Sequence, residues 1–156
     1  MDGLLKFVFL AALVVWLGGV VFFSFVAAPA IFRVFPAAEA GRAVGAIFPL
    51  YYAVGTGAGV VALAAGLGLW LRAPSGSGRW LAVAALLTVM LGANAYAWLA
   101  VWPRARALRE EMHRPSAAAP AAASAEFRRL HAQAMILNLV VLVAGVGVVG
   151  ATTLRS

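Results

Sequence analysis

The sequence predicts an all-α integral membrane protein, a four-helix bundle with a short interfacial helix after its first span. The 156-residue chain is 65% hydrophobic and 11% charged, whereas a soluble domain is about half apolar and a quarter charged. Four stretches are long and apolar enough to cross a hydrocarbon core of about 30 Å. Because lipid cannot satisfy backbone polar groups, each crossing stretch must be helical.

The whole chain, residues 1–156, is predicted to be a single transmembrane domain. Spans are expected at about residues 4–28, 48–71, 80–102 and 130–154. The polar segment RAPSGSGR between spans two and three is a tight turn, so these spans should be antiparallel neighbours.

The two remaining connections are longer. Residues 36–46 are expected to form a short interfacial helix, with Pro36 at its first position and Glu39 in its first turn. Residues from about 104 to 128 are expected to form a mobile loop. The string RARALREEMHR at its start is rich in helix formers, so span three should continue past Pro103 as a helix in water.

The formal net charge of +7 sits at the ends of the apolar stretches, as is typical of membrane anchors and not of a nucleic-acid-binding surface. The expected partner is therefore the lipid bilayer. More basic residues flank the first and third connections than the opposite side, which favours both termini outside and the long loop in the cytoplasm. The anchoring residues are Arg33, Arg42, Arg104, Arg128 and Arg129.

Catalytic and metal-binding patterns are missing from the sequence. The chain has no cysteine, and the predicted spans contain no carboxylate. No phosphate-binding loop, zinc-protease motif or nucleophile elbow is present. We therefore expect neither an enzyme nor a resident metal or cofactor, and His131 is the one histidine within the predicted spans.

Polar side chains recur at one depth in the predicted spans. Counting 1.5 Å per residue from the flanking arginines places Asn94 and Asn138 about 14–15 Å from that boundary. Ser24 and Thr56 lie at a similar level. Unpaired amides are costly in hydrocarbon, so both asparagines should face the interior. Either they hydrogen-bond to each other as structural glue, or they form a polar centre that binds a solute or ion.

His131, Met135 and Asn138 follow an i, i+4, i+7 spacing on one helix face. This face is either a ligand-binding stripe that reaches from the headgroups to the midplane or ordinary packing with an interfacial histidine. Tyr52 is a further candidate at the polar centre.

Small and aromatic residues predict how the helices pack. Gly55 and Gly59 form a GxxxG pair that lets two backbones approach closely. In span one, a stripe of four residues at helical spacing is predicted to face the core: Gly18, Phe22, Phe25 and Pro29.

The strings FSFVAAPAIFRVFP, AGRAVGAIFPLYY and FRRLHAQAMILNL together resemble the transmembrane protein 205-like family, which includes the bacterial domain of unknown function 4149. The resemblance implies a four-helix protein of the bacterial inner membrane, without an established transport chemistry. Its motif positions correspond here to Phe48, Pro49, Tyr51, Tyr52, His131, Leu137 and Asn138. More distant relatives are expected to use a histidine near the start of span one, which this chain lacks.

Three functions are compatible with these observations. The first is binding or movement of a small solute or ion at the polar centre, with His131 at its mouth. The second is an assembly role, in which the basic segment 104–114 binds anionic lipid or a partner protein. The third is a haem- or quinone-linked redox protein that uses His131. Four short helices enclose little volume, so a pore would require a homo-oligomer.

Overall fold

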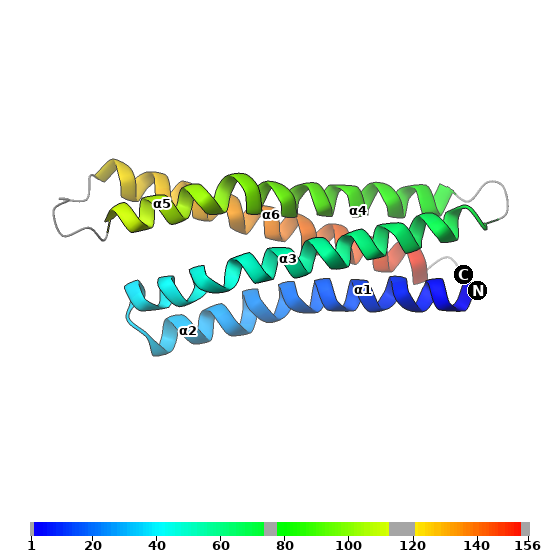
Figure 1. Cartoon of the computed structure of the whole chain (residues 1–156), viewed down its shortest axis with the longest axis horizontal. Coiled ribbons are helices and arrows are strands. Elements are labelled where there is room, and N and C mark those ends of the chain that lie inside the picture. Colours follow the sequence, from blue (N-terminus) through cyan, green and yellow to red (C-terminus); the bar gives the residue numbers. More distant parts are fainter. Residues whose placement is uncertain (1, 74–77, 113–120, 154–156) are drawn as a thin grey trace.

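The computed structural model describes residues 2–73, 78–112 and 121–153, which form four long helical rods (Figure 1). The first rod comprises α1 (Asp2–Phe22), η1 (Phe23–Ala27) and α2 (Ala28–Val34), and the second is α3 (Ala37–Trp70). The third comprises α4 (Gly78–Tyr96), η2 (Ala97–Val101) and α5 (Trp102–Met112), and the fourth is α6 (Ala121–Thr153). All four rods are long and apolar enough to cross a membrane. The predicted fold class is confirmed.

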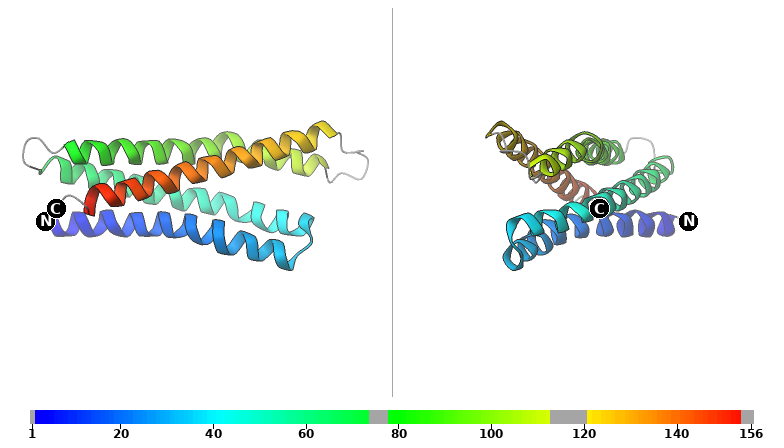
Figure 2. Two further views of the ribbon diagram at one scale, coloured as in Figure 1. Left: turned by 180° about the vertical axis from the view of Figure 1, so that it is seen from behind. Right: turned by 60° about the vertical axis from the view of Figure 1, so that its left-hand side comes forward.

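The rods pair into two hairpins. The first rod packs mainly against α3, and α4 packs mainly against α6, while α3 and α4 join the hairpins. Both hairpins start and finish at the end that holds Asp2 and Thr153 (Figure 1). We call the opposite end, which carries Arg33, Arg42 and Arg106, the arginine-rich end. There the two hairpins diverge, because α6 runs obliquely away from α2 (Figure 2).

A wider, π-helical turn interrupts the first and third rods. The turn η1 ends two residues before Pro29, and η2 ends two residues before Pro103. Proline has no backbone N–H, and its ring clashes with the carbonyl four residues earlier. In both rods that carbonyl lies inside the π turn, so an extra residue in the turn relieves the clash without breaking the helix.

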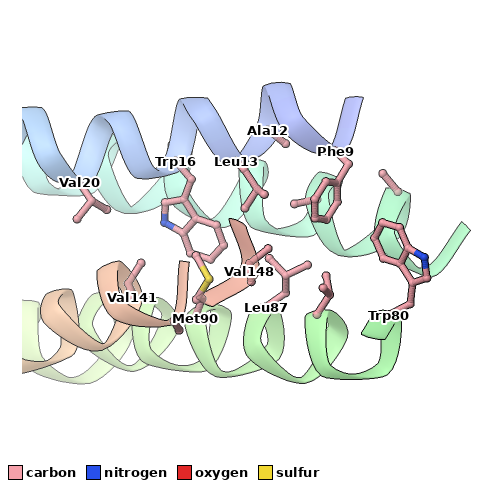
Figure 3. Packing of buried hydrophobic residues seen from close by; sticks show 14 of the residues in the cluster. Phe9, Ala12, Leu13, Trp16, Val20, Trp80, Leu87, Met90, Val141 and Val148 are labelled. Atoms are coloured by element: carbon pink, nitrogen blue, oxygen red, sulfur yellow. The ribbon is translucent and has the colours of Figure 1, made fainter. Parts of the chain in front are cut away.

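The apolar core lies toward the end that holds the termini (Figure 3). Residues from all four rods meet there, and the ring of Phe9 packs edge-on against Trp80 with centroids 5.7 Å apart. Trp16 is only 2% exposed and fills the centre of the bundle. The core members that Figure 3 labels are Phe9, Ala12, Leu13, Trp16, Val20, Trp80, Leu87, Met90, Val141 and Val148.

The predicted core-facing stripe of span one is wrong. Gly18 is exposed, and the side chains of Phe22 and Phe25 are 60% and 66% exposed. Pro29 is half-buried. The face that packs inward carries Phe9, Leu13, Trp16, Val20 and Phe23 instead. Both faces of this rod are apolar because one meets protein and the other meets lipid, so hydrophobicity alone does not distinguish them.

The helices extend further than the apolar stretches suggest. The helix predicted at 36–46 is present, but it forms the first turns of α3 and is continuous with the second span; Pro36 is its cap. The loop expected from 104 to 128 is helical in α5 up to Met112 and again in α6 from Ala121, because alanine, leucine, arginine and glutamate favour helix. Only residues 113–120 of that expected mobile loop lie outside the described part of the chain.

Candidate functional site

Two polar networks tie the rods together about halfway along the bundle. In the first, Asn138 on α6 links three rods. Its Oδ1 accepts a hydrogen bond of 2.6 Å from the Tyr51 hydroxyl on α3, and its Nδ2 donates to Ser24 Oγ in η1 at 2.9 Å. Each amide atom therefore has one partner on a different rod. The network holds α6 against both rods of the first hairpin.

The second network joins the two hairpins through Asn94 of α4, which is only 5% exposed. Its Nδ2 donates to the backbone carbonyl of Tyr52 at 3.2 Å and to Thr56 Oγ1 at 2.9 Å, both on α3. Its Oδ1 lies against Gly55, where a Cβ atom would approach it to 3.0 Å. The small residue at position 55 therefore makes room for the amide.

The two asparagines do not bond to each other, which corrects the interhelical pair expected between them. Each bonds instead to α3, at the adjacent residues Tyr51 and Tyr52, although α4 and α6 pack directly against each other. No buried side-chain nitrogen or oxygen in the described residues lacks a hydrogen-bond partner. The networks thus satisfy their own polar groups, as interhelical hydrogen bonds in membranes do.

A pocket of about 500 Å³ lies at the arginine-rich end, between the start of α3 in the first hairpin and α5 and α6 in the second. We call it the inter-hairpin pocket. Its apolar wall includes Phe48, Pro49, Val101, Leu130 and Ala134, and the side of Tyr52. Its polar wall consists of Arg42, Arg106, Arg109, Glu110 and His131. Neither Asn94 nor Asn138 lines it.

Charge on the polar wall is predominantly positive. Three arginines face one carboxylate, so the wall carries a net charge of +2 when His131 is neutral. Glu110 is already paired with Arg106, with Nε and Oε1 2.8 Å apart. That pair is solvent-exposed and contributes at most about 1 kcal/mol to stability, so it can rearrange at little cost.

Arg109 reaches across the pocket from α5 to α3 and α6. Its guanidinium donates to the carbonyl oxygen of Gly41 at 2.5 Å and lies 5.2 Å from the centroid of the Phe127 ring. The missing side chains of Gly41 and Gly45 form the groove that accepts it. A Cβ atom at position 45 would lie 2.6 Å from one guanidinium nitrogen. Arg109 thereby bridges the two hairpins where they diverge.

Replacing Gly45 with alanine is expected to displace Arg109 from this groove, because the new methyl group occupies the guanidinium position. The arginine side chain is long and can shift, so the loss of stability should stay below about 1 kcal/mol, the upper range for exposed charged contacts. Thermal unfolding in detergent measures it. The matched control is Gly41→Ala, whose Cβ would meet Arg109 at an ordinary contact distance of 3.6 Å. Equal unfolding temperatures of the two variants would contradict the placement of the Arg109 guanidinium against Gly45.

The other predicted site residues are dispersed. His131 is exposed at the edge of the pocket, stacked on Phe127 with ring centroids 6.4 Å apart. Met135 is 61% exposed and lies apart from the asparagine network. Along the expected stripe only Asn138 is part-buried and hydrogen-bonded, whereas His131 and Met135 are exposed.

The predicted anchors are all exposed: Arg33, Arg42, Arg104, Arg128 and Arg129. Of these, Arg42 also lines the inter-hairpin pocket. In the described ranges 2–73, 78–112 and 121–153, no group of three or more histidines or carboxylates is placed to hold a metal ion.

Sequence reasoning missed Arg106 and Arg109 as individual site residues, although a signal was present. Trp102, Arg106 and Arg109 follow an i, i+4, i+7 spacing and therefore share one face of α5. The guanidinium of Arg106 lies 5.7 Å from the Trp102 ring centroid on that face. A helix face with one tryptophan and two arginines just beyond a span is typical of a surface that contacts other helices. A segment exposed to water on all sides would not need the tryptophan.

The fold and these networks define the class: a multi-pass helical membrane protein with internally satisfied polar contacts and a basic-walled pocket at one end. Within this class, the model of the family described as domain of unknown function (DUF4149) matches residues 11–114, which is more than half of the chain. The protein belongs to that family. Comparisons with curated proteins and with solved structures found no match.

Proposed function

We propose that this protein binds a small anion with an apolar part in the inter-hairpin pocket. The observation that carries the proposal is the division of the pocket into an aromatic and aliphatic wall and a wall with three arginines. Its volume of about 500 Å³ lies within the range of small-molecule sites, roughly 300–1,000 Å³. Guanidinium groups recognise carboxylate and phosphate oxygens by paired hydrogen bonds.

This proposal moves the binding site away from the polar centre expected from the sequence. Ser24, Asn94 and Asn138 are engaged by hydrogen bonds within the bundle, so we assign them to packing. Tyr52 belongs to both regions, since its carbonyl binds Asn94 and its ring lines the pocket. His131 lines the edge of the pocket, so we again propose that it lies at the mouth of the binding site.

The double variant Arg42→Gln/Arg106→Gln is expected to bind octyl phosphate at least about tenfold more weakly than the natural protein. One lost charge-assisted hydrogen bond in a partly solvated site corresponds to about 1.5 kcal/mol, which is a factor of ten. Equilibrium dialysis of the protein in dodecyl maltoside measures the affinity. Glutamine keeps most of the stem length, so the apolar contacts persist.

The matched control is Arg72→Gln, which removes an exposed arginine at the opposite end of the bundle. Its affinity for octyl phosphate should equal that of the natural protein. Unchanged binding in the double variant, or an equal loss in the control, would show that octyl phosphate associates with the protein outside the pocket.

Kinship with the transmembrane protein 205 family and an orientation with the arginine-rich end in the cytoplasm of a bacterial inner membrane are parts of the same proposal. They rest on the motifs quoted above and on the arginine distribution. Because the chain has no cysteine, a single Ala37→Cys substitution tests the orientation. An impermeant maleimide should label it in inverted membrane vesicles and not in intact cells; the reverse pattern would refute the orientation.

A further inference from the structure

We infer that the anion held in the inter-hairpin pocket is an acidic membrane lipid, with its phosphate on the arginine wall and its chains directed into the bilayer. This inference rests on the proposed function and adds the source of the ligand. Three observations support it: the depth of the pocket, the direction in which its polarity changes, and its charge.

The depth of the pocket follows from helix length. Arg42 lies 30 residues before Arg72, and Arg109 lies 30 residues after Arg79. At 1.5 Å per residue each interval is about 45 Å, the thickness of a bilayer with both headgroup layers. Arg72 follows the end of α3 and Arg79 lies at the start of α4, both at the opposite end of the bundle. The pocket arginines therefore lie at the level of the headgroups on the arginine-rich side.

The floor of the pocket lies at the edge of the hydrocarbon. Tyr52 is 20 residues before Arg72, and Val101 is 22 residues after Arg79, which corresponds to about 30–33 Å of helix. A hydrocarbon core is about 30 Å thick. The apolar wall thus begins where acyl chains end and headgroups begin.

On both helices that carry the pocket arginines, the lining changes from polar at the outer level to apolar at the inner level. Along α3 the lining runs from Arg42 at the outer level to Pro49 and Tyr52 at the inner level. In the third rod it runs from Arg109 and Arg106 inward to Trp102 and Val101. A lipid in its normal orientation has the same order, phosphate outside and chains inside. A wholly water-soluble anion would not need the apolar inner wall.

The charge of the pocket selects an acidic headgroup. The net charge of +2 on the polar wall favours a phosphate monoester over a zwitterionic headgroup, whose choline would face the arginines. Phosphatidate is the simplest lipid with such a headgroup, so it is the probe of choice.

The test uses the full-length protein in vesicles of equal parts dioleoylphosphatidate and dioleoylphosphatidylcholine, extracted into dodecyl maltoside. Native mass spectrometry then counts the lipids that remain bound. We expect one phosphatidate per chain, retained at least about tenfold over phosphatidylcholine. In Arg42→Gln/Arg106→Gln this preference should disappear. In Arg128→Gln, which removes an exposed arginine of the same end outside the pocket lining, it should persist.

The outcomes separate this inference from the proposed function. If octyl phosphate binds but the natural protein retains both lipids equally, the pocket takes its anion from water and the lipid inference is overturned. The lipid inference is also overturned if inorganic phosphate and phosphatidate displace octyl phosphate from the protein at equal concentrations. If Arg128→Gln abolishes the preference as fully as the double variant, phosphatidate binds the basic surface and not the pocket. If neither octyl phosphate nor phosphatidate binds, both proposals fail.

Discussion

Replacing Gly59 with alanine is expected to lower the free energy of unfolding by about 2 kcal/mol, within the range found for overpacked cores. A Cβ atom at this position would lie 2.5 Å from the Trp16 ring and 2.6 Å from a methyl carbon of Leu91. The Trp16 side chain is 2% exposed and is enclosed by the core, so its ring must be displaced to admit the methyl group. The packing of the Trp16 ring of α1 against α3 therefore depends on the missing side chain at position 59.

Gly57 provides the matched control on the same helix. It is exposed, and a Cβ atom there would meet nothing within 4 Å. Gly57→Ala should leave stability unchanged or raise it by up to about 1 kcal/mol, because alanine favours helix over glycine. Unfolding of both variants from dodecyl maltoside by sodium dodecyl sulfate measures the difference. Equal stabilities would mean that the bundle can repack around position 59.

Replacing Asn138 with leucine is expected to cost about 2 kcal/mol of unfolding free energy. The change leaves the Tyr51 hydroxyl and Ser24 Oγ without the partners they have in the folded protein. Interhelical hydrogen bonds in membranes contribute about 0.6–1.7 kcal/mol each, and a buried polar group left unpaired costs about 1–3 kcal/mol. If Asn138 instead contacts a ligand, the variant should be more stable and lose binding.

A second substitution distinguishes a hydrogen bond from general packing. Adding Tyr51→Phe to Asn138→Leu removes the hydroxyl that the first change left unpaired, so about 1 kcal/mol should be recovered. Gln133→Leu is the control, since it converts an amide of the same helix that takes no part in the network. The same unfolding assay applies. Strict additivity of the two single variants would contradict the Tyr51–Asn138 bond.

Counting residues along the helices predicted which polar groups lie at the same level of the bundle. Ser24 and Asn138, placed at one level from the flanking arginines, are hydrogen-bonded in the structure. Thr56 and Asn94, placed at a similar level, are bonded to each other as well. Helical rise is nearly constant, so a depth follows from the number of residues. The same count says nothing about rotation around the helix axis or about which rods are neighbours, and the expected bond between Asn94 and Asn138 was wrong for that reason.

The prediction of which face of span one points into the core was wrong, because the outer face of a membrane helix is as apolar as its inner face. Phe22 and Phe25 are as apolar as Phe9 and Leu13, yet only the latter pair faces the core. The glycines indicated the packed face of α3 better, because a missing side chain leaves space that a neighbouring residue fills. Gly55 and Gly59 do lie on the packed face of α3, but the space that they leave is filled by the Trp16 ring and by side chains of α4, and not by a second backbone as the GxxxG spacing predicted.

The inter-hairpin pocket was not predictable from spacing alone. Its arginines come from two rods that are 64 residues apart in sequence at Arg42 and Arg106, and its volume exists because the hairpins diverge at one end (Figure 2). The shared face of Trp102, Arg106 and Arg109 was visible in the sequence, but the groove at Gly41 and Gly45 that receives Arg109 was not.

By itself the sequence determined the number of long apolar rods, their helical form and the relative levels of Ser24, Thr56, Asn94 and Asn138, because these follow from apolar length, backbone hydrogen bonding and a constant rise per residue. The tertiary structure alone decided which face of each rod points inward, which residue pairs with each asparagine, and where the bundle opens. Lipid and protein interior are equally apolar, so only the shapes of the packed side chains distinguish one face from another.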